Sequence, residues 1–293
     1  MISIYLMGGL GNQLFQIFTA LAYAMKYKLK LVFPYSEILV FGKERPTYWN
    51  NFLSSLIIHT TKYLQDISNT DLFEMPMLRE VGFNYVPIPE IKKDFMFYGY
   101  WQSYKYFDEF KERLFKKIGL PKIKRSMIEK VSPFYNLENN VDIQFISLHF
   151  RLGDYVAMPE CHPTQPCSYY EKSLHYLCEK TQYKKRIVLY FCESGDNSVV
   201  LESINNLKEK FHDIEFVKVY DDIPDWEQMV IMSCCNDNII ANSTFSWWGA
   251  YMNSAPNKIV CYPSVWFGEK MVTKEKHDDH IKDLFPPEWV KIS

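Results

Sequence analysis

The stretch Ile143-Gln-Phe-Ile-Ser-Leu-His-Phe-Arg-Leu-Gly-Asp-Tyr155 joins a short apolar run to a polar end. The apolar run is typical of a buried strand. His149, Arg151 and Asp154 stand at its carboxyl end, and Gly153 permits a sharp turn because glycine adopts positive φ freely. In open α/β sheets, ligands bind in the crevice beyond the carboxyl ends of strands. The stretch therefore predicts an α/β fold with a site at this edge.

An arginine at this edge suits a diphosphate, because its planar fork binds two oxygens at once and stays charged. Asp154 is placed to hold Arg151, and His149 is placed to bond a base or to act in proton transfer. A purely structural Arg151–Asp154 pair beside a core histidine explains the same residues. This stretch alone does not separate the two interpretations.

The second half of the chain alternates strands and helices. Strands are expected at 143–149, 187–192, 215–219, 237–241 and 258–262, and helices at 168–181, 198–211 and 226–234. This βαβ repetition predicts a parallel, doubly wound sheet.

The segment Asn242-Ser-Thr-Phe-Ser-Trp-Trp-Gly-Ala250 follows the buried strand that ends at Asn242. Its hydroxyls, together with the free N–H groups of a helix start, predict a phosphate cradle made by Asn242, Ser243, Thr244, Phe245 and Ser246. Ordinary capping of the helix by serine or threonine is the alternative. The two tryptophans that follow, at 247 and 248, are interpreted as core packing.

The first half opens with an alternating strand, the loop Gly8-Gly-Leu-Gly-Asn-Gln13 and a helix with apolar positions from 14 to 25. A Rossmann dinucleotide fingerprint needs glycine where this chain has Leu14, which argues against an NAD enzyme. The loop offers donors to phosphates or to a reacting sugar: the backbone N–H groups of Gly9 and Gly11 and the amides of Asn12 and Gln13. A tight turn with a capping asparagine is the alternative.

With 293 residues the chain exceeds what one core usually organises, so two domains are expected, at 1–140 and 141–293. Within the first, we expect a strand at 29–33, helices near 49–64 and 71–79, a strand to about 101 and a helix at 105–118. Residues 274–285 are expected to form a polar helix.

Three ordered motifs, Met7–Gln16, His149-x-Arg151-x-Gly153-Asp154-Tyr155 and Asn242–Ala250, resemble the alpha-1,2-fucosyltransferases, glycosyltransferase family eleven, of the soluble bacterial type. The resemblance covers nearly the whole chain. One departure is Leu152, where the family usually has a second arginine. The related protein O-fucosyltransferases also carry an aliphatic residue there, so the departure does not imply loss of activity.

The resemblance implies the GT-B architecture, in which two Rossmann-like domains face a cleft. It assigns GDP-β-L-fucose to the second domain and the acceptor to the first, and the helix at 274–285 can cross back to the first domain. The reaction it implies is inverting transfer of L-fucose to the 2-hydroxyl of a terminal galactose in a glycan, giving an α-1,2 linkage.

The resemblance also suggests further contacts. The family has paired aspartates after the strand that ends near 192, and a carboxylate there suits guanine N1–H and N2–H; Glu193 aligns best and Asp196 second, although Asp196 also fits a helix cap. A Gly-Tyr-x-Gln-Ser segment near the cleft implies that Tyr100, Trp101 and Gln102 line the acceptor sugar. An aromatic core is the alternative for this segment.

Transfer requires positive groups where the leaving GDP gains charge. Arg151, the 243–246 segment and Asn12 with its loop are placed to supply them, which makes Arg151, His149, Asp154 and Asn12 the expected catalytic set. The chain has no Asp-x-Asp, so neither a metal nor another cofactor is expected. The base that would assist the attacking hydroxyl is left open among residues 37, 71 and 74 of the first domain.

Bulk properties bound the partners and the compartment. The net charge of −2 gives no electrostatic footprint for nucleic acid. Seven cysteines without framework spacing indicate a reducing compartment, and those between 161 and 178 match no common zinc pattern. No stretch approaches the roughly 20 apolar residues that span a bilayer, and no basic leader is present, so a cytoplasmic enzyme is expected. The alternatives are a fucosyltransferase with another acceptor and a non-catalytic GDP-sugar or glycan-binding protein.

Overall fold

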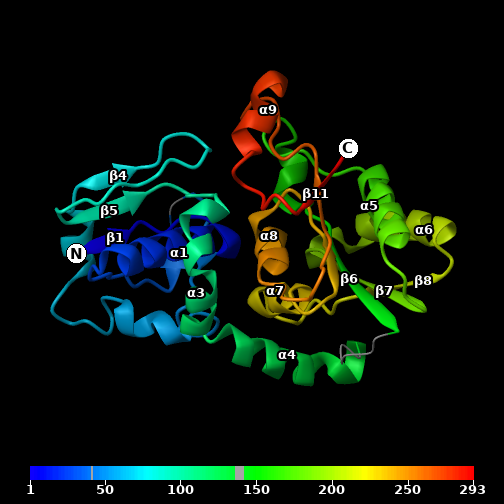
Figure 1. Cartoon of the computed structure of the whole chain (residues 1–293), viewed down its shortest axis with the longest axis horizontal. Helices are drawn as coiled ribbons and strands as arrows, with labels where there is room; N and C mark the ends of the chain where they lie inside the picture. Colours follow the sequence, from blue (N-terminus) through cyan, green and yellow to red (C-terminus); the bar gives the residue numbers. More distant parts are fainter. Residues whose placement is uncertain (41, 136–141) are drawn as a thin grey trace. The chain divides into compact units, whose positions relative to one another are not determined.

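The computed structural model describes residues 1–40, 42–135 and 142–293. They form two compact units, Met1–Lys122 with Asp279–Pro286 and Ile123–Asp278 with Pro287–Ser293. Each unit has its own parallel sheet with helices against it, so the predicted α/β class with two Rossmann-like units is confirmed (Figure 1).

The division between the units differs from the expected boundary at 140, which lies in 136–141, outside the described residues. The described chain divides after Lys122, within helix α4 (Leu120–Tyr135). Lys124, just after this division, donates from its ammonium group to the carbonyl oxygens of Ser233 at 2.8 Å and Met252 at 3.2 Å in the second unit. The segment 279–286, from the end of helix α9 (Lys274–Ile281), is grouped with the first unit.

The first unit is built on a three-stranded parallel sheet. Its order is β1 (Ile2–Ile4), β5 (Phe95–Tyr98) and β4 (Met77–Arg79). The expected strand at 29–33 is present only as two isolated bridges, which pair Ile2 with Leu31 and Phe33 with Thr60. Helix α1 (Leu10–Tyr27) buries one broad face, where the rings of Phe15 and Phe18 each lie 5.8 Å from that of Phe107.

Several helix predictions in the first unit are wrong. The expected helix at 71–79 is a short α2 (Asn69–Phe73) followed by strand β4, because Pro76 interrupts the helix and the edge of β5 is open for pairing. The expected helix at 49–64 is a 3-10 segment, η1 (Ser54–His59). The expected helix at 105–118 comprises η2 (Tyr104–Tyr106), η3 (Asp108–Phe110) and α3 (Lys111–Lys117). A small hairpin, β2 (Ile38–Leu39) with β3 (Arg45–Pro46), was not predicted.

The second unit contains the predicted doubly wound sheet. Its strands, in spatial order, are β11 (Val290–Ile292), β10 (Val260–Pro263), β9 (Asp237–Ile239), β6 (Ile143–His149), β7 (Lys185–Phe191) and β8 (Ile214–Lys218). All pairs are parallel. The helices are α5 (Cys167–Lys180), α6 (Asn197–Lys210), α7 (Asp225–Met232) and α8 (Thr244–Tyr251).

The order in which strands are added to the sheet reverses between β6 and β9. The chain first builds outward through β7 and β8, and then returns to add β9 on the other side of β6. Such a reversal opens a crevice at the carboxyl ends of the two strands. The central motif follows β6 and the serine-rich motif follows β9, so both begin at this switch point.

Candidate active site

Two distant motifs meet at the switch point of the second unit. His149 ends β6, and its Nδ1 lies 2.9 Å from Oγ of Ser246, in the first turn of α8. The hydroxyl of Tyr170 donates to the main-chain carbonyl of His149 at 3.2 Å. The sequence predicted both motifs at one sheet edge, and the structure joins them through this pair.

The His149 imidazole is neutral under ordinary conditions. Burial, and then the nearby Arg151 cation, lower its pKa from 6.5 to about 3. The ring is therefore equipped to give or accept a hydrogen bond, with the tautomer deciding which nitrogen donates. It does not act as a standing cation for phosphate.

Arg151 is the cation of this edge. One guanidinium nitrogen pairs with Asp154 and another with Glu193, and the guanidinium carbon lies 4.9 Å from the centre of the Tyr155 ring. Burial acts to lower the pKa of Arg151, but the two carboxylates outweigh it and raise the pKa above its ordinary value. The arginine is thus a permanent, oriented positive charge that is 16% exposed.

Gly153 allows Glu193 to approach this arginine. Its φ is +43°, and a Cβ built on it would lie 2.9 Å from Glu193 Oε2. Its N–H donates to Asp196 Oδ2 at 2.9 Å. Asp196 thus fixes the turn, whereas Glu193 keeps 56% of its side chain exposed and is the better placed of the two expected guanine contacts.

Leu152 has a packing role. Its side chain lies against the apolar cluster beneath the strands, which includes Leu148 and Val188. An aliphatic residue suits this environment because a charged group would be desolvated there. Leu152 thus contributes apolar packing at this position.

The serine-rich motif serves structure more than the sequence suggested. Ser243 Oγ accepts the N–H of Phe245 at 3.3 Å and so caps α8. The Asn242 amide donates to the carbonyls of Pro163 at 2.9 Å and Trp266 at 3.1 Å, which ties two loops together. Of the expected cradle hydroxyls, those of Ser243 and Ser246 are bonded within the protein; Thr244 is half-buried.

The two tryptophans are core residues, as predicted. Trp247 and Trp248 are fully buried, and the ring of Trp247 stacks on Tyr251 with centroids 4.7 Å apart. Gly249 lets α8 approach α7, because a Cβ there would lie 2.8 Å from the Cβ of Met232.

The loop after the central motif folds back over its own start. The Tyr155 ring stacks on His162 with centroids 4.7 Å apart, and its hydroxyl donates to the Asn242 carbonyl at 3.3 Å. Arg151, Tyr155 and His162 thus form a layered group. The sequence placed Tyr155 in a motif but gave it no role.

In the first unit, glutamine side chains hold the glycine loop. Gln13 Nε2 donates to the carbonyls of Gly8 at 3.0 Å and Pro46 at 2.9 Å. Gln16 binds both main-chain groups of Met7, accepting its N–H at 3.0 Å and donating to its carbonyl at 3.2 Å. The Gln13 amide nitrogen, expected to donate to a ligand, thus donates to main-chain carbonyls of the protein.

The other residues of the loop form a tight turn that leads into α1. Gly9 is the N-cap of α1 without a side-chain cap, and Gly11 lies buried in the first helical turn. Gly8 has φ +79°, and a Cβ there would lie 2.6 Å from Asn12 Nδ2. Asn12 Oδ1 accepts from Gln102 Nε2 at 2.9 Å, which links the loop to the expected acceptor segment.

The expected acceptor residues divide into one exposed and one buried aromatic. Tyr100 is 39% exposed, whereas Trp101 is 3% exposed and packs edge-on against Phe97 and Tyr106. Trp101 is therefore a core residue. Tyr100 and the half-buried Gln102 remain candidates for contact with a sugar.

Other candidates fall into structural roles. Asp71 closes a capping box with Ser68 at the start of α2, which commits its carboxylate. All seven cysteines are free thiols. Among the described residues, no three His, Cys, Asp or Glu side chains are grouped to hold a metal.

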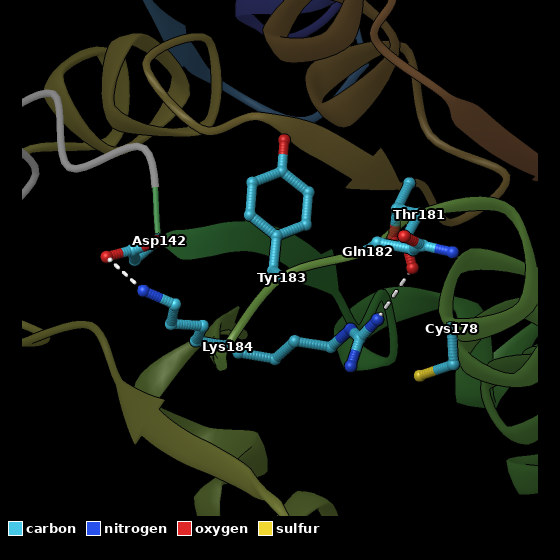
Figure 2. Close-up of a pocket in the computed structure, with 7 residues that line it drawn as sticks. Asp142, Cys178, Thr181, Gln182, Tyr183 and Lys184 are labelled. Atoms are coloured by element: carbon cyan, nitrogen blue, oxygen red, sulfur yellow. Dashed lines mark hydrogen bonds and ion pairs between the residues drawn. The ribbon is translucent and has the colours of Figure 1, made fainter.

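One cavity of the described structure lies away from this edge. It has a volume of about 550 Å³ and opens beside Tyr183, Lys184 and Arg186, near the amino ends of β6 and β7 (Figure 2). Lys184 pairs with Asp142 at 3.1 Å, and Arg186 donates to the Thr181 carbonyl at 2.9 Å (Figure 2). Its cations are thus already engaged by protein groups.

Two Rossmann-like units, one with a fixed cation at its switch point, suit a glycosyltransferase of the GT-B type, because such a cation can meet the charge of a leaving nucleotide. The profile of glycosyl transferase family 11 matches residues 1–293, and the chain belongs to that family.

Three relatives carry more specific names. O-antigen biosynthesis glycosyltransferase WbnK of Escherichia coli is 27% identical over 318 residues, covering 94% of this chain and 98% of the relative. An alpha-1,2-colitosyltransferase of Escherichia coli is 31% identical over 199 residues, 67% of this chain and 62% of the relative. A galactoside 2-alpha-L-fucosyltransferase of Caenorhabditis elegans is 24% identical, covering 100% of this chain and 79% of the relative.

Two solved structures are more distantly similar. Escherichia coli ADP-heptose lipopolysaccharide heptosyltransferase II has a TM-score of 0.34 at 11% identity, over 58% of this chain and 43% of that one. A family 9 glycosyl transferase of Veillonella parvula has a TM-score of 0.43 at 10% identity, over 98% of this chain and 90% of that one. Within the described part of the chain, no helix has the length and apolar character to cross a membrane.

Proposed function

We propose that this family 11 glycosyltransferase moves L-fucose from GDP-β-L-fucose to the 2-hydroxyl of a terminal galactose, with inversion, giving an α-1,2 linkage. The observation that carries the proposal is Arg151, a permanent cation held at the switch point of the second unit. Membership of family 11 and the similarity to a galactoside 2-alpha-L-fucosyltransferase support it.

Donor binding follows from the groups around Arg151. The diphosphate pairs with the guanidinium, which stabilises the charge that develops on the leaving GDP. Glu193 is then released from Arg151, and its two carboxylate oxygens match guanine N1–H and N2–H. His149 and the α8 start complete the surroundings of the phosphates as neutral hydrogen-bonding groups.

The acceptor binds at the first unit in this proposal. Tyr100 offers an exposed aromatic face to a sugar ring, and Asn12 with its loop contacts the sugar. Because Arg151 supplies the positive charge and the chain has no Asp-x-Asp, transfer proceeds without a metal. The enzyme acts in the cytoplasm, where GDP-sugars are made.

A second donor is favoured by one comparison. The relative named as an alpha-1,2-colitosyltransferase is 31% identical over its matched region. Colitose lacks the 3-hydroxyl of L-fucose, so the two donors share the GDP and most of the sugar. A GDP-colitose preference would keep the donor site as proposed and change only the sugar contacts.

The test is release of GDP from GDP-fucose, measured with and without lactose and in the presence of EDTA. Lactose-dependent release that survives EDTA, with an α-1,2-linked product, is the expected result. GDP binding without release from either GDP-fucose or GDP-colitose, across a panel of galactosides, would indicate another acceptor or a non-catalytic binding protein.

A further inference from the structure

The turn after β5 has an unusual backbone. Gly99 has φ +153° and Trp101 has φ +56°. A bulky residue with positive φ is strained and persists only where its surroundings determine its conformation. Contacts within the protein must therefore hold this turn in its conformation.

Glu80 supplies that restraint. Its carboxylate oxygen Oε2 accepts the backbone N–H of Tyr100 at 2.7 Å, and the N–H groups of Trp101 and Gln102 also act to lower the pKa of this carboxyl. The start of this turn is thus hydrogen-bonded to a carboxylate, and the backbone dipoles of the next two residues favour its charged form. Burial raises the pKa of Glu80 above its ordinary value, although the three N–H groups oppose the rise.

The main chain places Glu80 for this role. It directly follows β4, and its own N–H donates to the Tyr98 carbonyl at 2.9 Å. Gly99 permits the close approach, because a Cβ there would lie 2.3 Å from the Cβ of Glu80.

The restrained turn directs neighbouring side chains to different environments. Trp101 points into the core, while Tyr100 is left 39% exposed. Gln102 reaches Asn12 Oδ1 at 2.9 Å, so the turn also holds a residue of the glycine loop. Both side chains singled out for contact with substrate, Tyr100 and Asn12, are thus connected to Glu80.

A second anchor holds the other side of the turn. Ser103 donates its hydroxyl to the carbonyl of Asp283 at 2.5 Å, and the Asp283 carboxylate pairs with Lys105 and accepts the N–H of Tyr85 at 3.1 Å. The chain around the turn is therefore fixed at Ser103, and Glu80 determines the three residues before it.

We infer that Glu80 is a positioning residue for the acceptor: it sets the turn 99–102 so that Tyr100 presents its ring to a neutral sugar and Gln102 holds Asn12. This inference rests on the proposed function, because it assumes a glycan acceptor at the first unit. Glu80 acts here through the backbone of the turn, to which its carboxylate is hydrogen-bonded at the Tyr100 N–H.

The experiment compares Glu80→Gln with Glu90→Gln, a matched change at an exposed glutamate. Transfer kinetics are measured with both substrates varied, and binding of a panel of neutral galactosides is measured by NMR in the presence of GDP. Glu80→Gln should raise the acceptor KM about tenfold and leave the donor KM within about twofold. Glu90→Gln should match the wild-type enzyme.

A double-mutant cycle separates positioning from general loss of structure. Glu80→Asp keeps the charge on a shorter stem and should fold, with a smaller rise in acceptor KM. If Glu80 acts through Tyr100, adding Glu80→Asp to Tyr100→Ala should raise the acceptor KM little beyond Tyr100→Ala alone. Independent, multiplying effects would overturn the inference.

The other possible outcomes separate the positioning role of Glu80 from the proposed activity. An unchanged acceptor KM and unchanged galactoside binding in Glu80→Gln would overturn the inference while leaving the fucosyltransferase proposal standing. If the wild-type protein binds a galactoside but transfers no fucose, the proposed activity is wrong. The role of Glu80 is then tested by binding alone: weaker galactoside binding in Glu80→Gln would support it, and unchanged binding would overturn it. If the wild-type protein binds no neutral galactoside, the inference is overturned.

Discussion

The carboxyl edge of β6 and the glycine loop before α1 are both sharp turns after a parallel strand, but they are held in different ways. At the first, Arg151 is paired with Asp154 and Glu193. At the second, the neutral amides of Gln13 and Gln16 bind main-chain groups of the loop. Arg151 can exchange a carboxylate partner for another anion. The buried main-chain groups of the loop have no replacement partner if the glutamine bonds are lost. The charged edge is thus suited to binding, and the neutral loop to keeping its shape.

The energetic consequences should differ in the same direction. Removing Arg151 leaves carboxylates that reach solvent, with Asp154 29% and Glu193 56% exposed. Removing Gln16 leaves the main-chain groups of Met7 without partners in a buried environment. Unsatisfied buried groups cost more than exposed charges that water can solvate. Substitution of Arg151 at the edge should therefore reduce function, whereas substitution of Gln16, which holds the loop, should reduce stability.

The largest effect is expected from Arg151→Ala. Removing the cation that meets the leaving GDP should lower kcat/KM for GDP-fucose by about 1,000-fold. The melting temperature should change little, because the freed carboxylates are partly solvated. Arg125→Ala, at an exposed arginine of the same unit, is the control and should retain activity. Near wild-type turnover in Arg151→Ala would show that the diphosphate binds elsewhere.

Gln16→Met should have the opposite profile. The change keeps the volume of the side chain but removes both bonds to Met7, so the free energy of unfolding should fall by about 2–4 kcal/mol. Denaturant unfolding measures this, and calorimetry with GDP should give an affinity near that of the wild-type protein. If GDP affinity fell instead and stability held, the contrast between edge and loop would be broken.

Gly153→Ala tests the approach of Glu193 to Arg151. The new methyl group meets Glu193 Oε2 at 2.9 Å and must also adopt φ +43°. We expect the donor KM to rise about tenfold, or about 1.4 kcal/mol. Gly82→Ala is the matched control, because Gly82 has φ +74° but no atom within 4 Å of an added Cβ. Equal effects in both variants would attribute the loss to backbone strain alone.

The smallest effect is a pH dependence of stability from His149. Its pKa is 6.5 in the unfolded chain and about 3 when folded, so between these values the unfolded chain binds more protons. The free energy of unfolding should therefore fall as the pH is lowered, by about 1 kcal/mol from pH 6.5 to pH 5.5. His149→Gln should lack this component. Urea titrations at several pH values would show it, and parallel profiles for the two proteins would contradict a buried neutral imidazole.

Local patterns predicted the second unit well. The βαβ spacing placed β6, β7, β8, β9 and β10 close to their observed positions, because buried parallel strands read as apolar runs of characteristic length. The first unit was harder to predict. The segment with Met77–Arg79 reads as a helix locally but pairs with β5, since tertiary pairing outweighs weak propensity.

The candidate site shows the same limit. The motifs pointed to Arg151, His149 and Glu193, but they did not show that the amide nitrogens of Gln13 and Asn242 donate to main-chain carbonyls within the protein. Glu80 lies outside every motif and was missed. No local pattern marks a carboxylate whose partners are backbone N–H groups twenty residues further along the chain.

The sequence by itself determined the α/β class, the parallel sheet of the second unit and the motifs that mark family 11, because periodicity and residue type are local properties of the chain. Only the tertiary structure decided which polar side chains remain available to a ligand. That depends on pairings between distant segments, such as Arg151 with Glu193 and Glu80 with the turn at Tyr100, and hydrogen-bonding capacity is committed only when those segments meet.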